Sequence, residues 1–173
     1  MHTSVELQPA FIIHSRNYRE TSQLVDFITP DYGRVSVVAK GVKRNKSYRN
    51  LLHPFSRILI SWYGKGELKS LRSADQAGAG ETLVLRGDAL FSGMYINELL
   101  SILFKVHDHS ERIFNGYRQV LTQLANSGAI EPALRGFEKL LLEELGYGIP
   151  FPVYTGADHR EIDLPVAETR YYY

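Results

Sequence analysis

The side chains with the clearest chemistry are five cations that fall within ten positions, Lys40, Lys43, Arg44, Lys46 and Arg49. Val35, Val37 and Val38 precede them and are typical of a strand, and Gly41 interrupts the run. A segment this polar does not belong in a core, so we expect a basic loop held out from a small β-domain. Each cation brought to a phosphate releases condensed counterions. The pattern therefore predicts a surface that binds a polyanion, the alternative being a solvated loop.

Further residues extend this candidate DNA-binding set. Arg16, Arg19 and Arg34 become neighbours of the loop if the segment after the first strand lies near it. Bases of single-stranded DNA also stack on aromatic rings, and the candidates for stacking are Tyr18, Tyr48, Trp62 and Tyr63. Trp62 ends an apolar run, so we expect it in the core instead.

The charge is divided unevenly along the chain. The net charge is +1, but residues 1–73 hold twelve Lys/Arg against five Asp/Glu, whereas residues 74–173 hold eight against fourteen. A region at +7 attracts phosphates and a region at −6 repels them. The asymmetry indicates two regions with different partners, unless one globule simply carries its charge unevenly.

Composition excludes several classes of protein. There is no cysteine among the 173 residues, so disulfides and thiolate metal sites are excluded. No apolar run reaches the roughly 18 residues that a membrane span needs, and the N-terminus lacks the pattern of a secretory signal. We expect a soluble, cytoplasmic protein with no membrane partner.

The first part of the chain reads as five short strands, at residues 10–14, 23–29, 34–39, 55–62 and 67–73. The polar segment 15–22 is expected to be a loop, and Pro30-Asp31-Tyr32-Gly33 a turn. Five strands in about 65 residues suit a small barrel better than a flat sheet with two exposed edges. We therefore predict a barrel domain over residues 1–76.

The later part reads as helical, at residues 83–91, 94–106, 111–126 and 131–145. Tyr95, Leu99, Ile102 and Val106 are spaced three or four apart and predict a core-facing stripe. We predict a helical domain over residues 77–150, with α+β as the fold class of the whole chain. Residues 151–173 read as an irregular tail, either the start of an incomplete C-terminal part or the end of a naturally short protein.

Catalysis finds little support in the sequence. His107 and His109 offer an H-x-H spacing that could ligate a metal, but the segment also reads as the polar end of a helix. No G-x-x-x-x-G-K-[ST] phosphate loop occurs, and the small-residue stretch 77–81 lacks the strand and helix of a dinucleotide site. We predict no catalytic residue, no cofactor and no enzyme activity.

Several blocks resemble the bacterial RecO family of recombination mediators in DNA repair. They are AFIIHSRNYRETS at 10–22, GRVSVVAKGVKRNKS at 33–47, LLHPFSRILISWYGKGELKSLRSAD at 51–75, YINELL at 95–100 and EPALRGFEKLLLEELGYG at 131–148. The resemblance implies an N-terminal OB-fold and a helical domain. Because the family usually continues further, the chain looks like the N-terminal two-thirds of such a protein.

The resemblance also implies a function. The family binds single- and double-stranded DNA, anneals strands coated with single-strand-binding protein (SSB), and with its partner RecR helps to load the recombinase RecA. Some members carry a four-cysteine zinc site, so a chain without cysteine looks like the zinc-free branch, and we predict no metal.

A second site is expected in the helical domain, where the resemblance places binding of the SSB C-terminal tail. An exposed apolar groove beside a cation can accept such an acidic, apolar peptide. Arg135 is the main candidate, with Arg118 and Lys139 near it. Gly136 stands where relatives can carry a second basic residue, which puts the affinity for the tail in doubt. The alternative function is an adaptor that binds an acidic tail without annealing DNA.

Overall fold

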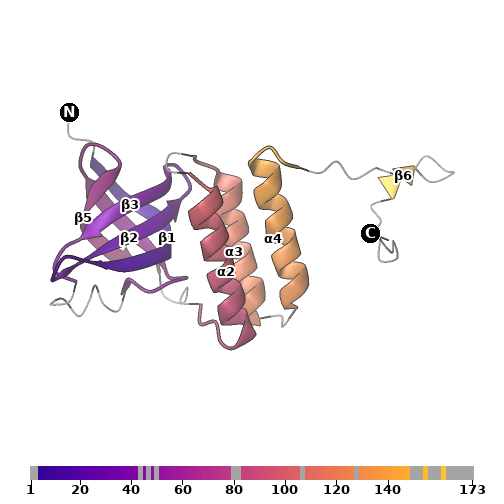
Figure 1. Cartoon of the computed structure of the whole chain (residues 1–173), viewed down its shortest axis with the longest axis horizontal. Helices are drawn as coiled ribbons and strands as arrows, with labels where there is room; N and C mark the ends of the chain where they lie inside the picture. Colours follow the sequence, from indigo (N-terminus) through magenta and orange to yellow (C-terminus); the bar gives the residue numbers. More distant parts are fainter. Residues whose placement is uncertain are drawn as a thin grey trace.

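The barrel and the helices predicted from the sequence are both present in the computed structural model. It describes residues 4–42, 45, 48, 51–78, 83–105, 108–126, 129–148, 154–155 and 161–162. Five strands close a barrel in the order β1-β2-β3-β5-β4, namely β1 (Ser4–Tyr18), β2 (Ser22–Thr29), β3 (Gly33–Ala39), β4 (Arg57–Tyr63) and β5 (Leu68–Gln76). Three helices follow, α2 (Asp88–Leu103), α3 (Glu111–Asn126) and α4 (Ile130–Glu144), with α4 furthest from the barrel (Figure 1). The predicted fold class is confirmed.

Strand alternation builds the barrel core. Val25 and Phe27 of β2 and Val35 and Val37 of β3 are buried in one cluster inside the barrel, because successive side chains of a strand point to opposite faces. Trp62 lies in the same cluster at 2 % exposure, with the Tyr32 ring edge-on at 5.2 Å. The prediction that Trp62 is a core residue is confirmed, and Trp62 is not available for base stacking.

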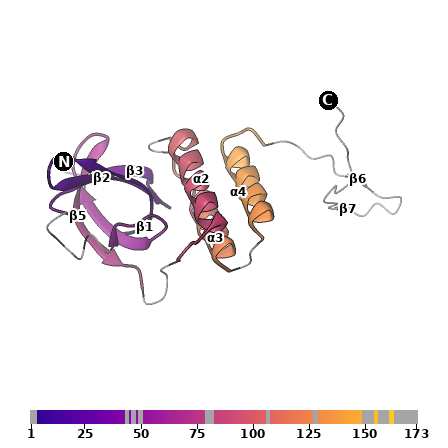
Figure 2. The same cartoon turned by 60° about the horizontal axis from the view of Figure 1, so that its bottom comes forward.

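The outer face of the barrel and the helices share a second core. Phe11, Ile13 and Ile28 are buried in one cluster with side chains from all three helices. The Phe11 ring centroid lies 5.2 Å from that of Phe114 and 5.2 Å from that of Tyr117. The helices lie beside the barrel in both views (Figures 1 and 2). The two predicted domains are therefore joined by apolar packing, and the boundary at residues 76 and 77 stays a prediction.

A backbone contact adds to this joint. Gly33 has φ +63°, and a Cβ placed on it would lie 1.9 Å from the backbone oxygen of Asp108. Only a residue without a side chain allows this approach. The guanidinium of the next residue, Arg34, donates a hydrogen bond to the backbone oxygen of Ser101 in α2. The start of β3 thus contacts both the last turn of α2 and the connection between α2 and α3.

The first strand is longer than predicted. Residues 15–18 were expected in a loop but belong to β1, where Ser15 pairs with Val25 and Tyr18 with Ser22. Strand pairing satisfies the backbone N–H and C=O groups of these polar residues. Local composition does not reveal that pairing. The connection shrinks to a turn at residues 19–21, in which Arg19 has φ +55°.

The first helix also differs from the prediction. Residues 83–91 and 94–106 were expected to form two helices, but one helix, α2, spans 88–103. Gly93 lies inside it, where a Cβ would meet the Leu85 side chain at 2.6 Å, so glycine marks a close contact and not a break. The predicted core stripe is wrong at Tyr95 and Ile102, which are 41 % and 68 % exposed, whereas Leu99 is half-buried and packs against the core. The buried face lies on the opposite side of α2, at Ile96 and Leu100, and Val106 lies outside the described residues.

Beyond Gly148 the structure describes two short strands, β6 (Tyr154–Thr155) and β7 (Glu161–Ile162), which pair antiparallel. The rest of the predicted tail, 151–173, lies outside the described residues. None of the described helices is long and apolar enough to cross a bilayer.

Candidate nucleic-acid interface and peptide-binding face

The strand register places residues from β1, β2 and β3 in rows on the outside of the barrel. His14 pairs with Asp26 and Asp26 with Ser36, and one row further Arg16 pairs with Leu24 and Leu24 with Val38. Because Val37 and Ala39 point into the barrel, Val38 and Lys40 point outward. We call this side of the barrel the outer β1–β3 face. Its exposed residues are His14, Arg16 and Lys40, and it also includes Leu24, Asp26, Ser36 and Val38, of which Leu24 and Val38 are buried.

Two of the predicted DNA-binding cations lie on this face. Arg16 and Lys40 are both exposed, and neither has an ion-pair partner among the residues that the structure describes. They lie on β1 and at the end of β3, so β2 separates them. Arg16 and Lys40 come onto one face only through the pairing of strands that are distant in the chain. From the sequence alone, Arg16 was expected near the basic loop only if the segment after the first strand lies near that loop.

The hairpin tip adds a third cation and an aromatic ring. The Arg19 guanidinium lies 5.3 Å from the centroid of the Tyr18 ring, within the range of a cation–π contact. Tyr18 is half-buried and belongs to the same outward series as Arg16. The pair therefore offers a charge for a phosphate and a ring for a base at the edge of the outer β1–β3 face.

The remaining candidates divide into two groups. Arg34 lies where the barrel meets the helices, and its hydrogen bond to Ser101 gives it a structural role there, so the structure does not group it with Arg16 and Lys40. Lys43, Arg44, Lys46 and Arg49 lie outside the described residues. They follow Lys40 closely in the chain, and their role in DNA binding stays a prediction.

Two other candidate aromatics lie around the barrel from this face. Tyr48 donates a hydrogen bond of 3.3 Å to the backbone oxygen of Arg72 and is half-buried. The Arg72 guanidinium lies 5.7 Å from the Tyr63 ring centroid and pairs with Glu6 at 3.1 Å. Arg72 therefore points toward β4 and its charge is compensated.

An anion that sequence reasoning missed lies in the middle of the outer β1–β3 face. Asp26 accepts a hydrogen bond from the Ser36 hydroxyl, and its carboxylate lies 3.8 Å from Nδ1 of His14. Its side chain is 19 % exposed. A carboxylate at this position repels a phosphate, so DNA contacts are expected further along the strands, toward Arg16 and Lys40.

The helices present a different surface, which combines apolar and charged side chains. Phe91, Tyr95 and Ile102 share the exposed side of α2, at 70 %, 41 % and 68 % exposure. On α4, Leu142 is 38 % exposed and follows Glu138 by one turn. We call the surface formed by Phe91, Tyr95, Ile102, Arg135, Glu138 and Leu142 the α2/α4 face. Large apolar side chains gathered at the surface mark an interaction site.

Arg135, the main candidate for peptide binding, lies on this face but is already paired. Its guanidinium donates to Oε2 of Glu138, one turn along α4, and the Tyr95 hydroxyl donates to Oε1 of the same carboxylate at 2.8 Å. This hydrogen bond is the main cause that raises the pKa of Tyr95. Sequence reasoning missed Glu138, although the i,i+3 spacing is a signal for such a pair.

The other two peptide-binding candidates are placed differently. Lys139 follows Arg135 by one turn, and its ammonium lies 3.9 Å from Glu143. Arg118 is exposed on α3, two positions after Gly116, which faces Leu140 of α4. Two positions correspond to about 200° around a helix, so Arg118 points away from α4. The structure thus brings Lys139 near Arg135 but not Arg118.

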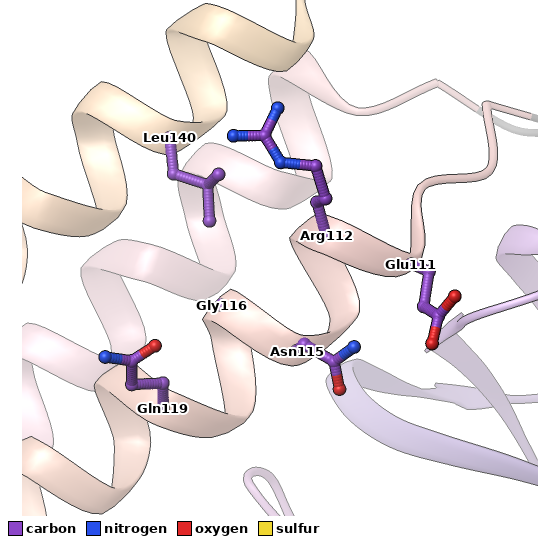
Figure 3. A pocket seen from close by; sticks show the side chains of 6 residues that line it. All are labelled: Glu111, Arg112, Asn115, Gly116, Gln119 and Leu140. Carbon is purple, nitrogen blue, oxygen red and sulfur yellow. The ribbon is translucent and has the colours of Figure 1, made fainter.

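A shallow pocket of about 320 Å³ lies on another side of the helices, between α3 and α4 (Figure 3). It forms where Leu140 passes over Gly116. The Arg112 guanidinium at its edge is compensated by Glu144 at 2.5 Å, and Glu144 also accepts a hydrogen bond from Ser110. None of the residues predicted for DNA or peptide binding lines this pocket.

Both parts of the chain match a known family. Residues 1–79 match the family described as Recombination protein O N terminal, and residues 85–153 match Recombination protein O C terminal. The chain belongs to the RecO family. The two family matches therefore correspond to the barrel and to the helices.

Individual RecO relatives match the chain over most of its length. A DNA repair protein RecO from Cellvibrio japonicus is 45% identical over 85% of the chain and 62% of its own length. Those from Nitrosococcus oceani and Sodalis glossinidius are each 47% identical, over 84% and 83% of the chain and 58% and 55% of their own lengths. The chain thus spans about three-fifths of the length of these RecO relatives.

Proposed function

We propose that the chain binds single- and double-stranded DNA in recombinational DNA repair and anneals complementary strands. The observation that carries this proposal is the placement of Arg16 and Lys40 on one outward face, beside the Arg19–Tyr18 pair and just before the basic segment that begins at Lys43. Annealing requires no covalent bond to form or break. Cations that neutralise both strands allow the two polyanions to approach.

We propose further that this RecO-family chain acts on SSB-coated DNA and, together with RecR, helps RecA to load. Membership of the RecO family supports this step. The α2/α4 face supports binding of the SSB tail, because Arg135 and Tyr95 meet at Glu138 and the same side of α2 exposes the apolar Phe91 and Ile102, which suits a short acidic peptide with apolar side chains. The alternative proposal is an adaptor that uses this face alone and does not anneal DNA.

The decisive experiment combines two variants with three measurements, namely DNA binding, strand annealing and peptide binding. Changing Lys43, Arg44 and Lys46 together to Glu is expected to abolish binding of a labelled oligonucleotide and annealing of two complementary strands. Arg135→Ala is expected to weaken binding of an acidic tail peptide and to leave DNA binding unchanged. Retained DNA affinity in the triple variant would refute the proposed role of the loop.

The alternative proposal, an adaptor that does not anneal DNA, predicts a different result. In that case the unmodified chain binds the tail peptide through Arg135 but does not accelerate annealing at any protein concentration. Partner binding is measured separately, by co-elution of the chain with purified RecR, because the chain covers about three-fifths of its relatives.

A further inference from the structure

The two hydrogen-bond donors of the α2/α4 face, Arg135 and Tyr95, are both bound to Glu138 of the same protein. The Glu138 carboxylate uses Oε2 to accept a hydrogen bond from Arg135 and Oε1 to accept one from Tyr95. The Tyr95–Glu138 bond measures 2.8 Å, and the Glu138 side chain is 17 % exposed. Both oxygens of one carboxylate are thus held by two donors from two helices.

An arginine and a hydroxyl that converge on one point are typical of a carboxylate-binding site. The apolar side chains around them suit a peptide with apolar residues beside its carboxylates, since Phe91 and Ile102 on the same side of α2 are mostly exposed. The chain after residue 73 is acidic overall, with eight Lys/Arg against fourteen Asp/Glu, and residues 83–148, which include the helices, hold six Lys/Arg against eight Asp/Glu. Arg135 must therefore supply the local attraction, and Glu138 cancels it.

We propose that Glu138 is an intramolecular competitor that occupies the carboxylate site of the α2/α4 face and lowers its affinity for an acidic peptide. This inference rests on the proposed binding of an acidic tail at Arg135. An incoming carboxylate replaces Glu138 on Arg135 and Tyr95, and Glu138 moves into solvent. Binding is thereby weakened by the cost of breaking the internal pair, which keeps the complex reversible.

The test uses a fluorescein-labelled peptide with several aspartates and a C-terminal phenylalanine, titrated by anisotropy against the whole chain. Glu138→Gln is expected to tighten binding by about two- to fivefold, the size of one exposed ion pair. Glu111→Gln is the matched control, because it removes one exposed charge at the pocket between α3 and α4 and leaves the candidate Lys139 in its pair with Glu143. A thermal melt of each variant shows that it is folded.

The outcomes separate the two proposals. If Arg135→Ala weakens binding while Glu138→Gln and the unmodified chain bind equally, the peptide site stands and the competitor role is refuted. Equal tightening in Glu138→Gln and Glu111→Gln also refutes it, because net charge alone then explains the gain. If the unmodified chain binds no peptide, or binds it independently of Arg135, the proposed site fails and the competitor role fails with it.

Discussion

Removing Arg16 and Lys40 together, as Arg16→Gln and Lys40→Gln, tests whether the outer β1–β3 face holds DNA. The structure places both side chains outward and exposed, on two strands separated by β2. For single-stranded DNA, each phosphate contact contributes about 0.7 to the slope of log K against log salt. Two lost contacts reduce the slope by about 1.4. At about 0.1 M salt this corresponds to roughly 25-fold weaker binding, and the difference disappears near 1 M.

The assay is fluorescence anisotropy of a labelled single-stranded oligonucleotide across a salt series. The matched control is Lys139→Gln, which removes one cation from α4 on the helical side of the molecule. It is expected to leave both slope and affinity unchanged. A loss of affinity with an unchanged slope, or an equal effect in the control, would refute the reasoning, because either result assigns the effect to folding or to net charge.

Three further outcomes follow from the packing. Gly33→Ala is expected to lower the melting temperature far more than Gly41→Ala, since both have positive φ but only Gly33 faces backbone within 4 Å. Tyr117→Phe leaves the buried Asn97 oxygen without its donor and is expected to cost about 1–3 kcal/mol in urea unfolding. Phe91→Ser, at a side chain that is 70 % exposed, is expected to weaken acidic-peptide binding severalfold and to shift the melting temperature little.

The barrel could be predicted from the sequence because the alternation of inward and outward side chains along a strand is a local pattern. Val35 and Val37 point inward as their spacing indicates, and Trp62 at the end of an apolar run is core. The sequence could not predict the length of β1, because the strand character of Arg16 comes from pairing with Leu24 on β2. Pairing partners are distant in the chain, and polar composition at this position otherwise favours a loop.

The orientation of α2 was mispredicted for a related reason. Two apolar faces compete on this helix, and periodicity cannot say which one is buried. The face with Ile96 and Leu100 packs into the core shared with the barrel, while Tyr95 and Ile102 remain exposed. The candidate peptide site depends on that outcome. A helix that is apolar on both sides is itself a signal that one side serves another partner.

The outer surface of the barrel contacts the helices at one end of its strands and carries exposed cations at the other. On β3, Arg34 lies at the joint with the helices and Lys40 lies beyond the other end of the strand. Six residues of extended strand span about 20 Å. Screening at physiological salt acts over about 8 Å. The acidic helical half therefore does not cancel the field at Lys40, although it packs directly on the barrel. The strand length thus separates the proposed phosphate-binding end of the barrel from the helices, which carry the proposed peptide site.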